Sequence, residues 1–269
     1  MSKLRILYVA NEINPFLQTS EVADFVRKLP QAMQERGMEI RILVPRFGTI
    51  NERKNRLHEV VRLSGINISV GDEEKPLVIK VASIPNAKLQ VYFIDNEDYF
   101  HRKHVFFDKE NKFFEDNDER AIFFCKGVIE TVRKLGWAPD IVHCNDWMTS
   151  LVPMYLKTTY KNDPLFANTK TVFTVYNNEF THKFSENLID KVKMIDIEDS
   201  MLTHLESADL EGFIRIGMQY SDLVIRSGEN FNERMEEVLS KFNDKKIEEI
   251  DADQDFLDSY YNLYNELVG

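Results

Sequence analysis

The segment FLQTSEVADFVRKLP, residues 16–30, follows an expected strand and begins an expected helix. In many α/β proteins this place binds a phosphate, because free backbone amides and the helix dipole favour an anion there. Such a turn is usually rich in glycine, which lets the backbone approach the phosphate closely. This turn has no glycine and contains Gln18, Thr19 and Ser20 instead. It is a phosphate site, the remains of one, or an ordinary helix start capped by Thr19 or Ser20.

For the other residues with metal-binding or nucleophilic side chains, the sequence favours structural roles. His101 and His104, in the stretch HRKH, have a spacing that suits metal ligands, but the two cations between them disfavour a divalent ion. We expect a solvated loop there. Cys125 and Cys144 match no metal-ligand spacing, and we expect both to be small core residues. The sequence therefore predicts no metal site and no bound cofactor.

The composition is that of a folded, acidic protein. The chain has 269 residues, 43% of them hydrophobic, and a formal net charge of -11. Because no basic patch stands out, the sequence does not predict nucleic-acid binding. The apolar run at the N-terminus is too short for a signal peptide, and no other run reaches membrane-spanning length. We expect a cytoplasmic protein that binds neither nucleic acid nor membrane.

The elements that position these residues alternate along the chain. Short runs rich in Val, Ile and Leu alternate with amphipathic segments, which is typical of parallel strands connected by helices. The predicted core strands are Leu4–Ala10, Ile40–Leu43, Ile141–His143, Thr171–Thr174 and Leu223–Ile225. Helices are expected after Thr19 or Ser20, over Asp118–Leu135, and from near Asp146 and Glu211. The fold class is α/β, a doubly wound Rossmann-like parallel sheet with helices on both faces.

Two further regions add to this sheet. Three extended segments between Leu57 and Asp95 show the alternation and turn signals of antiparallel pairing. Residues 230–269 are expected to form two helices joined by the acidic stretch EEIDADQD, the last running from about Gln254 to Val268. The apolar stripe of that last helix predicts packing against the domain body. We divide the chain into a Rossmann-like domain, residues 1–229, and a helical extension, residues 230–269.

Ligands of a doubly wound sheet bind beyond the carboxyl ends of its strands, which directs the search to the segments there. These segments are NEINPFLQTSEVADF, PRFGTI, NDWMTSLVPMYL and YNNEF. Between Leu4 and Arg226 the chain has, in order, the blocks ANEINPFLQTSEVADF, LPQAM, GMEIRILVPRFG, VYFID, GWAPDIVHCNDW, LVPMYL, TVFTVYN and YSDLV. On these blocks the sequence resembles the N-terminal domain of bacterial glycogen and starch synthases, one half of a GT-B fold. The resemblance implies transfer of glucose from ADP-glucose to an α-1,4-glucan.

The turn after the first strand departs from the family pattern. The family has KTGGL there, with a lysine that contacts the nucleotide phosphates and two glycines that admit them. This sequence has QTSEV, in which Gln18 lacks the cation, Ser20 adds a side chain and Glu21 adds a charge that repels a diphosphate. By family position Gln18, Thr19 and Ser20 are substrate-binding residues. The departure favours a capped helix start that remains from a phosphate site.

The segments after two other strands supply the remaining candidates. Asn145 aligns with a family histidine that reaches the glucose, and an amide can bond a sugar hydroxyl but cannot carry the charge of imidazole. Asp146 is retained and also suits a helix N-cap. Tyr176 replaces the histidine of the family HN turn, where it stacks on a sugar or packs in the core, and Asn177 matches the asparagine. His143 is expected in the core, and no residue is assigned as catalytic.

The resemblance stops before the second family domain, which holds the donor nucleotide. We therefore expect neither transferase activity nor ADP-glucose binding from this chain alone. One hypothesis is a synthase-like enzyme that acts only when a protein partner supplies or replaces the donor domain. The other is a non-catalytic glucan-binding or regulatory protein that docks on a partner in glycogen metabolism. The candidate small-molecule ligands are an α-glucan and ADP-glucose.

Overall fold

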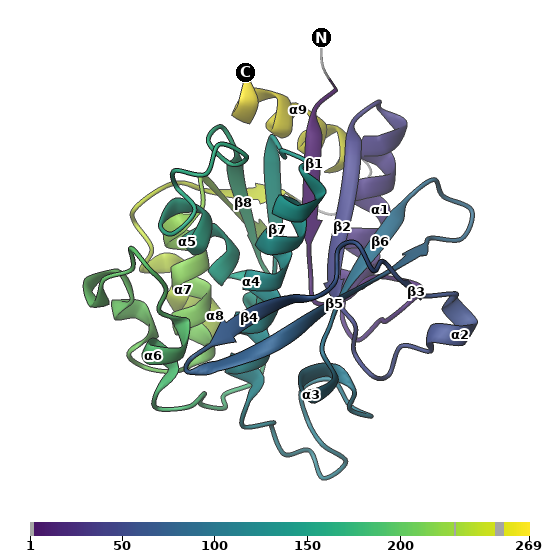
Figure 1. The fold of residues 1–269 in the computed structure, drawn as a ribbon. Helices are drawn as coiled ribbons and strands as arrows, with labels where there is room; N and C mark the ends of the chain where they lie inside the picture. Colours follow the sequence, from purple (N-terminus) through teal and green to yellow (C-terminus); the bar gives the residue numbers. More distant parts are fainter. Residues whose placement is uncertain (1–2, 229, 251–255) are drawn as a thin grey trace.

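The computed structural model describes residues 3–228, 230–250 and 256–269. Within these residues a ten-stranded sheet has the order β10-β9-β8-β7-β1-β2-β6-β5-β3, and β4 pairs with β5 off this path. Helices cover both faces of the sheet (Figure 1). The strands are β1 Arg5–Val9, β2 Glu39–Pro45, β3 His58–Glu59, β4 Ile66–Val70, β5 Glu73–Ser83, β6 Gln90–Asp95, β7 Ile141–Asn145, β8 Lys170–Val175, β9 Leu223–Ser227 and β10 Ile247–Ile250.

The helices connect these strands as a doubly wound fold requires. The α-helices are α1 Val22–Glu35, α2 Glu52–Asn55, α3 Glu97–Phe100, α4 Asn117–Leu135, α5 Leu151–Lys157, α6 Leu188–Val192, α7 Leu210–Tyr220, α8 Glu233–Ser240 and α9 Phe256–Val268. Short 3-10 turns cover Trp147–Thr149, Asp199–Met201 and Thr203–Leu205. No described helix is long and apolar enough to cross a membrane.

The predicted fold class is confirmed. Strands β2, β1, β7, β8 and β9 pair in parallel, as the alternating apolar runs indicate. The expected antiparallel region is also present, because β5 pairs antiparallel with β3, β4 and β6. Strand β6 then runs parallel to β2, which joins this region to the parallel sheet.

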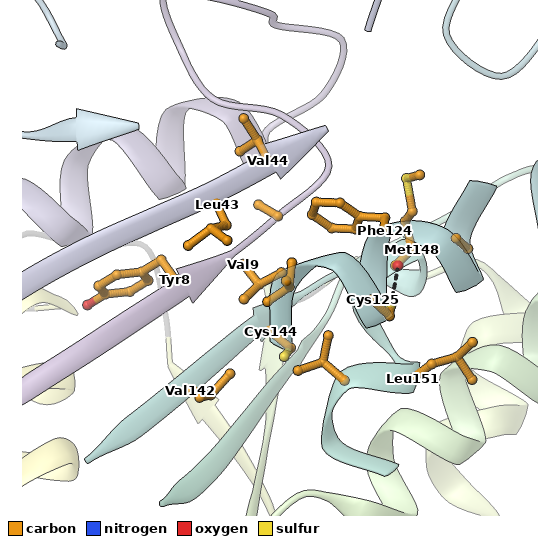
Figure 2. Close-up of a cluster of buried hydrophobic side chains, with 14 of the residues drawn as sticks. Tyr8, Val9, Leu43, Val44, Phe124, Cys125, Val142, Cys144, Met148 and Leu151 are labelled. Carbon is orange, nitrogen blue, oxygen red and sulfur yellow. Dashed lines mark hydrogen bonds between the residues drawn. The ribbon is translucent and has the colours of Figure 1, made fainter. Parts of the chain in front are cut away.

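The core lies between the sheet and its helices, and both cysteines belong to it. Figure 2 shows side chains of β1, β2 and β7 facing Phe124 and Cys125 of α4. Cys125 and Cys144 are fully buried, and the Cys125 thiol donates to the carbonyl of Met148 at 3.2 Å. The prediction that both are core residues is confirmed. Close packing continues at α7, where a Cβ on Gly217 would lie 2.7 Å from Cζ of Phe173.

The expected helix from near Asp146 is wrong in its first turn. A 3-10 turn over Trp147–Thr149 comes first, and α5 begins only at Leu151. Asp146 is the N-cap residue of this 3-10 turn, with φ 71° and ψ 169°, and its carbonyl accepts from the Thr149 amide at 3.1 Å. Its side chain makes no capping hydrogen bond, so the cap that the sequence suggested is absent.

The segment after β9 also differs from the prediction. Ile247–Ile250, taken as part of an acidic connection between two helices, is strand β10 and pairs in parallel with β9. In this edge strand Glu249 is exposed and the other three positions are partly buried. Gln254, the expected start of the last helix, lies outside the described residues, and α9 is described from Phe256.

Helix α9 lies against the body of the protein. Tyr260 and Tyr264 are buried, and the ring of Tyr260 lies 5.4 Å from that of Phe25 in α1. The Arg36 guanidinium, just after α1, lies 5.4 Å from the centre of the Tyr261 ring. The division of the chain at residues 229 and 230 stays a prediction.

Candidate functional site

The candidate site lies at the carboxyl ends of β1, β7 and β8. Strand β1 pairs with β2 on one side and β7 on the other, so the chain leaves the sheet there in diverging directions, which opens a crevice. A cavity of about 160 Å³ is present at this place. It is lined by Asn11, Thr19, Ser20, Glu21, Val22, Phe106, Asp146, Trp147, Tyr176, Asn177, Asn178 and Phe180.

The turn before α1 is organised by a buried carboxylate. Glu12 is 1% exposed and accepts hydrogen bonds from the Thr19 amide at 2.5 Å, the Thr19 hydroxyl at 2.7 Å and the Ser20 hydroxyl. The Ser20 oxygen in turn accepts from the amide of Val22 at 3.2 Å, at the first turn of the helix. An internal anion therefore takes up the donors that a bound phosphate would need.

Gln18 is directed to a different partner. Its amide nitrogen donates to the Asp24 carboxylate at 2.9 Å, and its oxygen accepts from Asn14 at 3.4 Å. Among the described residues that line the cavity, Gln18 does not occur. The structure thus brings Thr19 and Ser20 to the cavity, and it leaves Gln18 beside α1.

Asp146 is a buried acid with an unusual backbone. It is 5% exposed, and its carboxylate accepts from the Asn178 side chain at 2.6 Å. Burial raises the pKa of Asp146 from an ordinary value of 3.8 to about 6, and the nearby Glu12 and Glu21 carboxylates add to the rise. Its positive φ with extended ψ is a region that residues with a side chain rarely adopt. Strain of this kind is concentrated at binding sites.

The Asn145 side chain is buried and hydrogen-bonded to neighbouring groups of the protein. Its side-chain nitrogen donates to the carbonyls of Val9 and His143, each at 3.2 Å, and its oxygen accepts from the Tyr176 hydroxyl at 3.0 Å. Asn145 is fully buried and, among the described lining residues, it is not found. His143 is also fully buried, as expected of a core residue.

Tyr176 and Asn177, which follow β8, also line the cavity. Tyr176 is 2% exposed, and its ring lies 6.1 Å from that of Phe25, so it serves packing while one part of it lines the cavity. Asn177 is exposed at the rim, where its oxygen accepts from the amide of Asn232 at 3.0 Å and from its side chain at 2.9 Å.

Sequence reasoning missed Asn11. This residue is 4% exposed, lines the cavity, and its side-chain oxygen has no hydrogen-bond partner among the described residues. A buried polar atom without a partner costs about 1 to 3 kcal/mol, so a ligand hydrogen there would be stabilising. Its place directly after β1 was a signal, but only the structure shows the unpaired atom.

The aromatic walls at Phe106 and Phe180 were missed as well. The centres of their rings lie 5.2 and 5.5 Å from that of Trp147, so both rings pack on Trp147 where it lines the cavity. Phe106 lies far from the strand ends in sequence, whereas Phe180 ends the segment YNNEF directly after β8 and was not singled out as a ligand contact. Aromatic faces of this kind suit the apolar faces of a sugar ring.

The cavity is acidic and rich in hydrogen-bond acceptors. Asp146 and Glu21 contribute carboxylates, and Glu12 lies behind the turn. Burial also raises the pKa of Glu21. Among the described residues that line the cavity there is no lysine or arginine. The site can accept hydrogen bonds from hydroxyl groups.

A second group of side chains that could bind a metal lies at the carboxyl end of β6. Oxygen and nitrogen atoms of Glu52, Asp95 and His101 lie within 4.8 Å of one another. Lys80 already contacts the Asp95 carboxylate at 2.9 Å and that of Glu52 at 2.6 Å, so cations of the protein neutralise them. Residues 101–104 lie in a mostly exposed loop, as expected, and within it the His101 Nε2 lies 3.0 Å from the buried Asp95 carboxylate.

Comparison with known proteins is decisive for the family. The family model described as the starch synthase catalytic domain matches residues 5–249. The chain belongs to this family. The glycogen synthase of Chlorobium limicola is 47% identical over 174 residues, 64% of this chain and 36% of that protein. That of Pelodictyon phaeoclathratiforme is 37% identical over 235 residues, 86% of this chain and 47% of that protein.

The solved structures agree with this assignment at the level of fold. The catalytic domain of starch synthase IV from Arabidopsis thaliana, bound to ADP and acarbose, matches with a TM-score of 0.70 at 20% identity. The match covers 83% of this chain and 45% of that one. The chain spans about half the length of the curated relatives it matches. The family resemblance expected from the sequence blocks is confirmed.

Proposed function

We propose that this chain is a glycogen- or starch-synthase-like protein that holds an α-glucan and does not by itself transfer glucose from ADP-glucose. The observation that carries the proposal is the acidic, acceptor-rich cavity at the ends of β1, β7 and β8. The same site serves either a glucan-binding or regulatory protein, or a transferase whose donor site a partner chain supplies.

The turn before α1 supports the loss of donor binding. In the family a lysine and two glycines receive the nucleotide phosphates, whereas here Glu12 occupies the amide of Thr19 and the hydroxyls of Thr19 and Ser20. Glu21 and Asp146 face the same cavity as carboxylates. A diphosphate would meet repulsion from several anions and no lining cation, which removes most of its binding free energy.

The same features suit a neutral sugar. A sugar hydroxyl can donate to the unpaired oxygen of Asn11 and to the Asp146 carboxylate. The rings of Phe106 and Phe180 provide apolar surface beside these acceptors. A ligand with many donors and no negative charge therefore fits the cavity best.

Titration calorimetry tests both parts of the proposal. We expect heat of binding with a maltooligosaccharide such as maltoheptaose, and none with ADP-glucose at millimolar concentration. ADP and acarbose are included because the solved starch synthase IV binds them. Micromolar binding of ADP-glucose, or glucosyl transfer by the purified chain, would refute the proposal.

Asn11 supplies a residue-level test. Asn11→Ala should weaken maltoheptaose binding by about three- to tenfold, the usual value of one hydrogen bond, without lowering thermal stability. Asn243→Ala, at an exposed position away from the cavity, is the matched control and should bind like the unmodified chain. Equal affinities of the two variants would show that the unpaired oxygen takes no part in binding.

A further inference from the structure

A larger cavity lies on a different part of the molecule. It has a volume of about 520 Å³ and lies beside strand β4, helix α4 and the segment around Ile195. It shares no lining residue with the cavity at the ends of β1, β7 and β8. Nothing in the proposed function uses it, so its chemistry can be considered on its own.

Lys126 of α4 supplies the charge of this cavity. The residue is 3% exposed, and its ammonium donates to one neutral acceptor, the carbonyl of Ser69 in β4, at 2.8 Å. The ring of Tyr155 lies 5.7 Å away. Among the described residues no carboxylate pairs with Lys126, and burial lowers its pKa to about 8. An ammonium has three donor hydrogens, so two remain for a ligand.

The other charged groups that line the cavity are already paired. Glu130 accepts from Arg133 at 2.9 Å and from the Tyr160 hydroxyl at 2.6 Å. Lys193 pairs with Asp199 and Asp190. A buried cation without a counter-ion is costly, so a bound anion would stabilise this arrangement.

Part of the lining of the cavity is apolar. Met194 and Ile195 line it, and Ile195 is 78% exposed, one of few large hydrophobic side chains that reach solvent in the described chain. The volume lies in the range of small-molecule sites. A buried cation and apolar side chains in one cavity point to a ligand that has both a negative charge and an apolar body.

We propose that this cavity binds a small organic anion, with its carboxylate on Lys126 and its apolar body along Met194 and Ile195. A carboxylate on the Lys126 ammonium supplies the missing counter-ion, and the apolar body covers surface that is otherwise exposed. The site is independent of the glucan site, so the failure of either proposal leaves the other standing.

The test uses a series of straight-chain carboxylates, from acetate through butyrate to hexanoate, titrated into the full chain. Binding should tighten by about two- to fourfold per added methylene, as apolar burial predicts. Lys126→Met should weaken hexanoate binding at least tenfold while leaving maltoheptaose binding unchanged. Lys134→Met is the matched control, since Lys134 lies on the same helix and also donates to a backbone carbonyl, at 2.7 Å, but is exposed.

A second variant keeps the proposal testable if Lys126→Met does not fold. Ile195→Ser, at an exposed position, should leave acetate binding unchanged and flatten the gain from acetate to hexanoate. Hexanoate binding equal to that of acetate in the unmodified chain would overturn the proposal. Unchanged hexanoate binding by a folded Lys126→Met variant would overturn it as well.

Discussion

The hydroxyl of Tyr264 lies 2.6 Å from Nδ1 of His143, and this contact joins α9 to the middle of the sheet. The other ring nitrogen of His143 lies 2.7 Å from the Thr174 hydroxyl of β8. The ring of Tyr260 stacks on the same imidazole, with centroids 5.9 Å apart. A polar group inside the sheet is thus satisfied by side chains from two other elements, and α9 becomes part of the core.

Tyr264→Phe should lower the free energy of unfolding by about 1 to 3 kcal/mol, because it leaves a buried imidazole nitrogen without its partner. Urea unfolding at pH 7 measures the change. Tyr261→Phe, on the same helix, keeps its ring under Arg36 and should cost less than 0.5 kcal/mol. Equal effects of the two changes would show that the contact between Tyr264 and His143 adds nothing to stability.

His143 should make the protein sensitive to acid. Burial lowers its pKa from 6.5 to about 3, so between these values the unfolded chain binds a proton that the folded chain does not. Its contribution to stability is complete above pH 6.5 and is lost as the pH falls, by an amount on the order of 5 kcal/mol. His143→Gln should flatten the dependence of unfolding free energy on pH in this range. An unchanged slope would contradict the buried neutral imidazole.

Asp146 should make stability depend on pH in the opposite direction. Its pKa is raised from 3.8 to about 6, so the folded chain holds an extra proton between these values and stability falls as the pH rises. Asp146→Asn keeps the acceptor for Asn178 and the tolerance of positive φ. The variant should be more stable at pH 7 by about 2 to 3 kcal/mol, with the gain vanishing below pH 4. Urea unfolding from pH 4 to pH 8 checks this, and a constant difference would refute it.

The turn before α1 offers a gain-of-function test. Replacing Gln18 by Lys, Ser20 by Gly and Glu21 by Gly restores a cation and removes an anion at the start of the helix. Affinity for inorganic pyrophosphate should rise at least tenfold, as one charge-assisted contact predicts. Glu35→Gly, a removal of charge at the far end of the same helix, is the control. If the triple variant binds pyrophosphate no better than the control, the turn is not the cause of lost anion binding.

The parallel core could be predicted because its strands are buried on both faces and read as continuous apolar runs. Ile141 and Val142 carry that signal, and so do Val172 and Phe173. Strand β10 could not be predicted in this way, since an edge strand of sequence IEEI has a half-solvated pattern that also suits an acidic connection. Pairing with β9 outweighs the weak local preference.

A cavity lies at the strand ends to which the sequence directed the search, and the binding roles of its residues stay predictions. The strand ends pointed to Thr19, Asp146 and Tyr176, and all three line the cavity. The sequence could not show that the Asn145 side chain is hydrogen-bonded to neighbouring groups of the protein, or that the oxygen of Asn11 is unpaired. Hydrogen-bond satisfaction depends on atoms from separate elements, which no local pattern contains.

Because both thiols are buried between the sheet and α4, their reaction with a thiol reagent can report on opening of this part of the core. Burial raises the pKa of Cys125 to about 12 and that of Cys144 well above its usual value, so the native chain offers a thiol reagent almost no thiolate. Each alkylated molecule therefore records a passage through an open form. Cys125 marks α4 and Cys144 marks β7, as Figure 2 shows, so equal labelling rates mean that helix and sheet part together. Faster labelling at Cys125 would show that α4 detaches before the sheet opens, and the measurement needs no substitution in the chain.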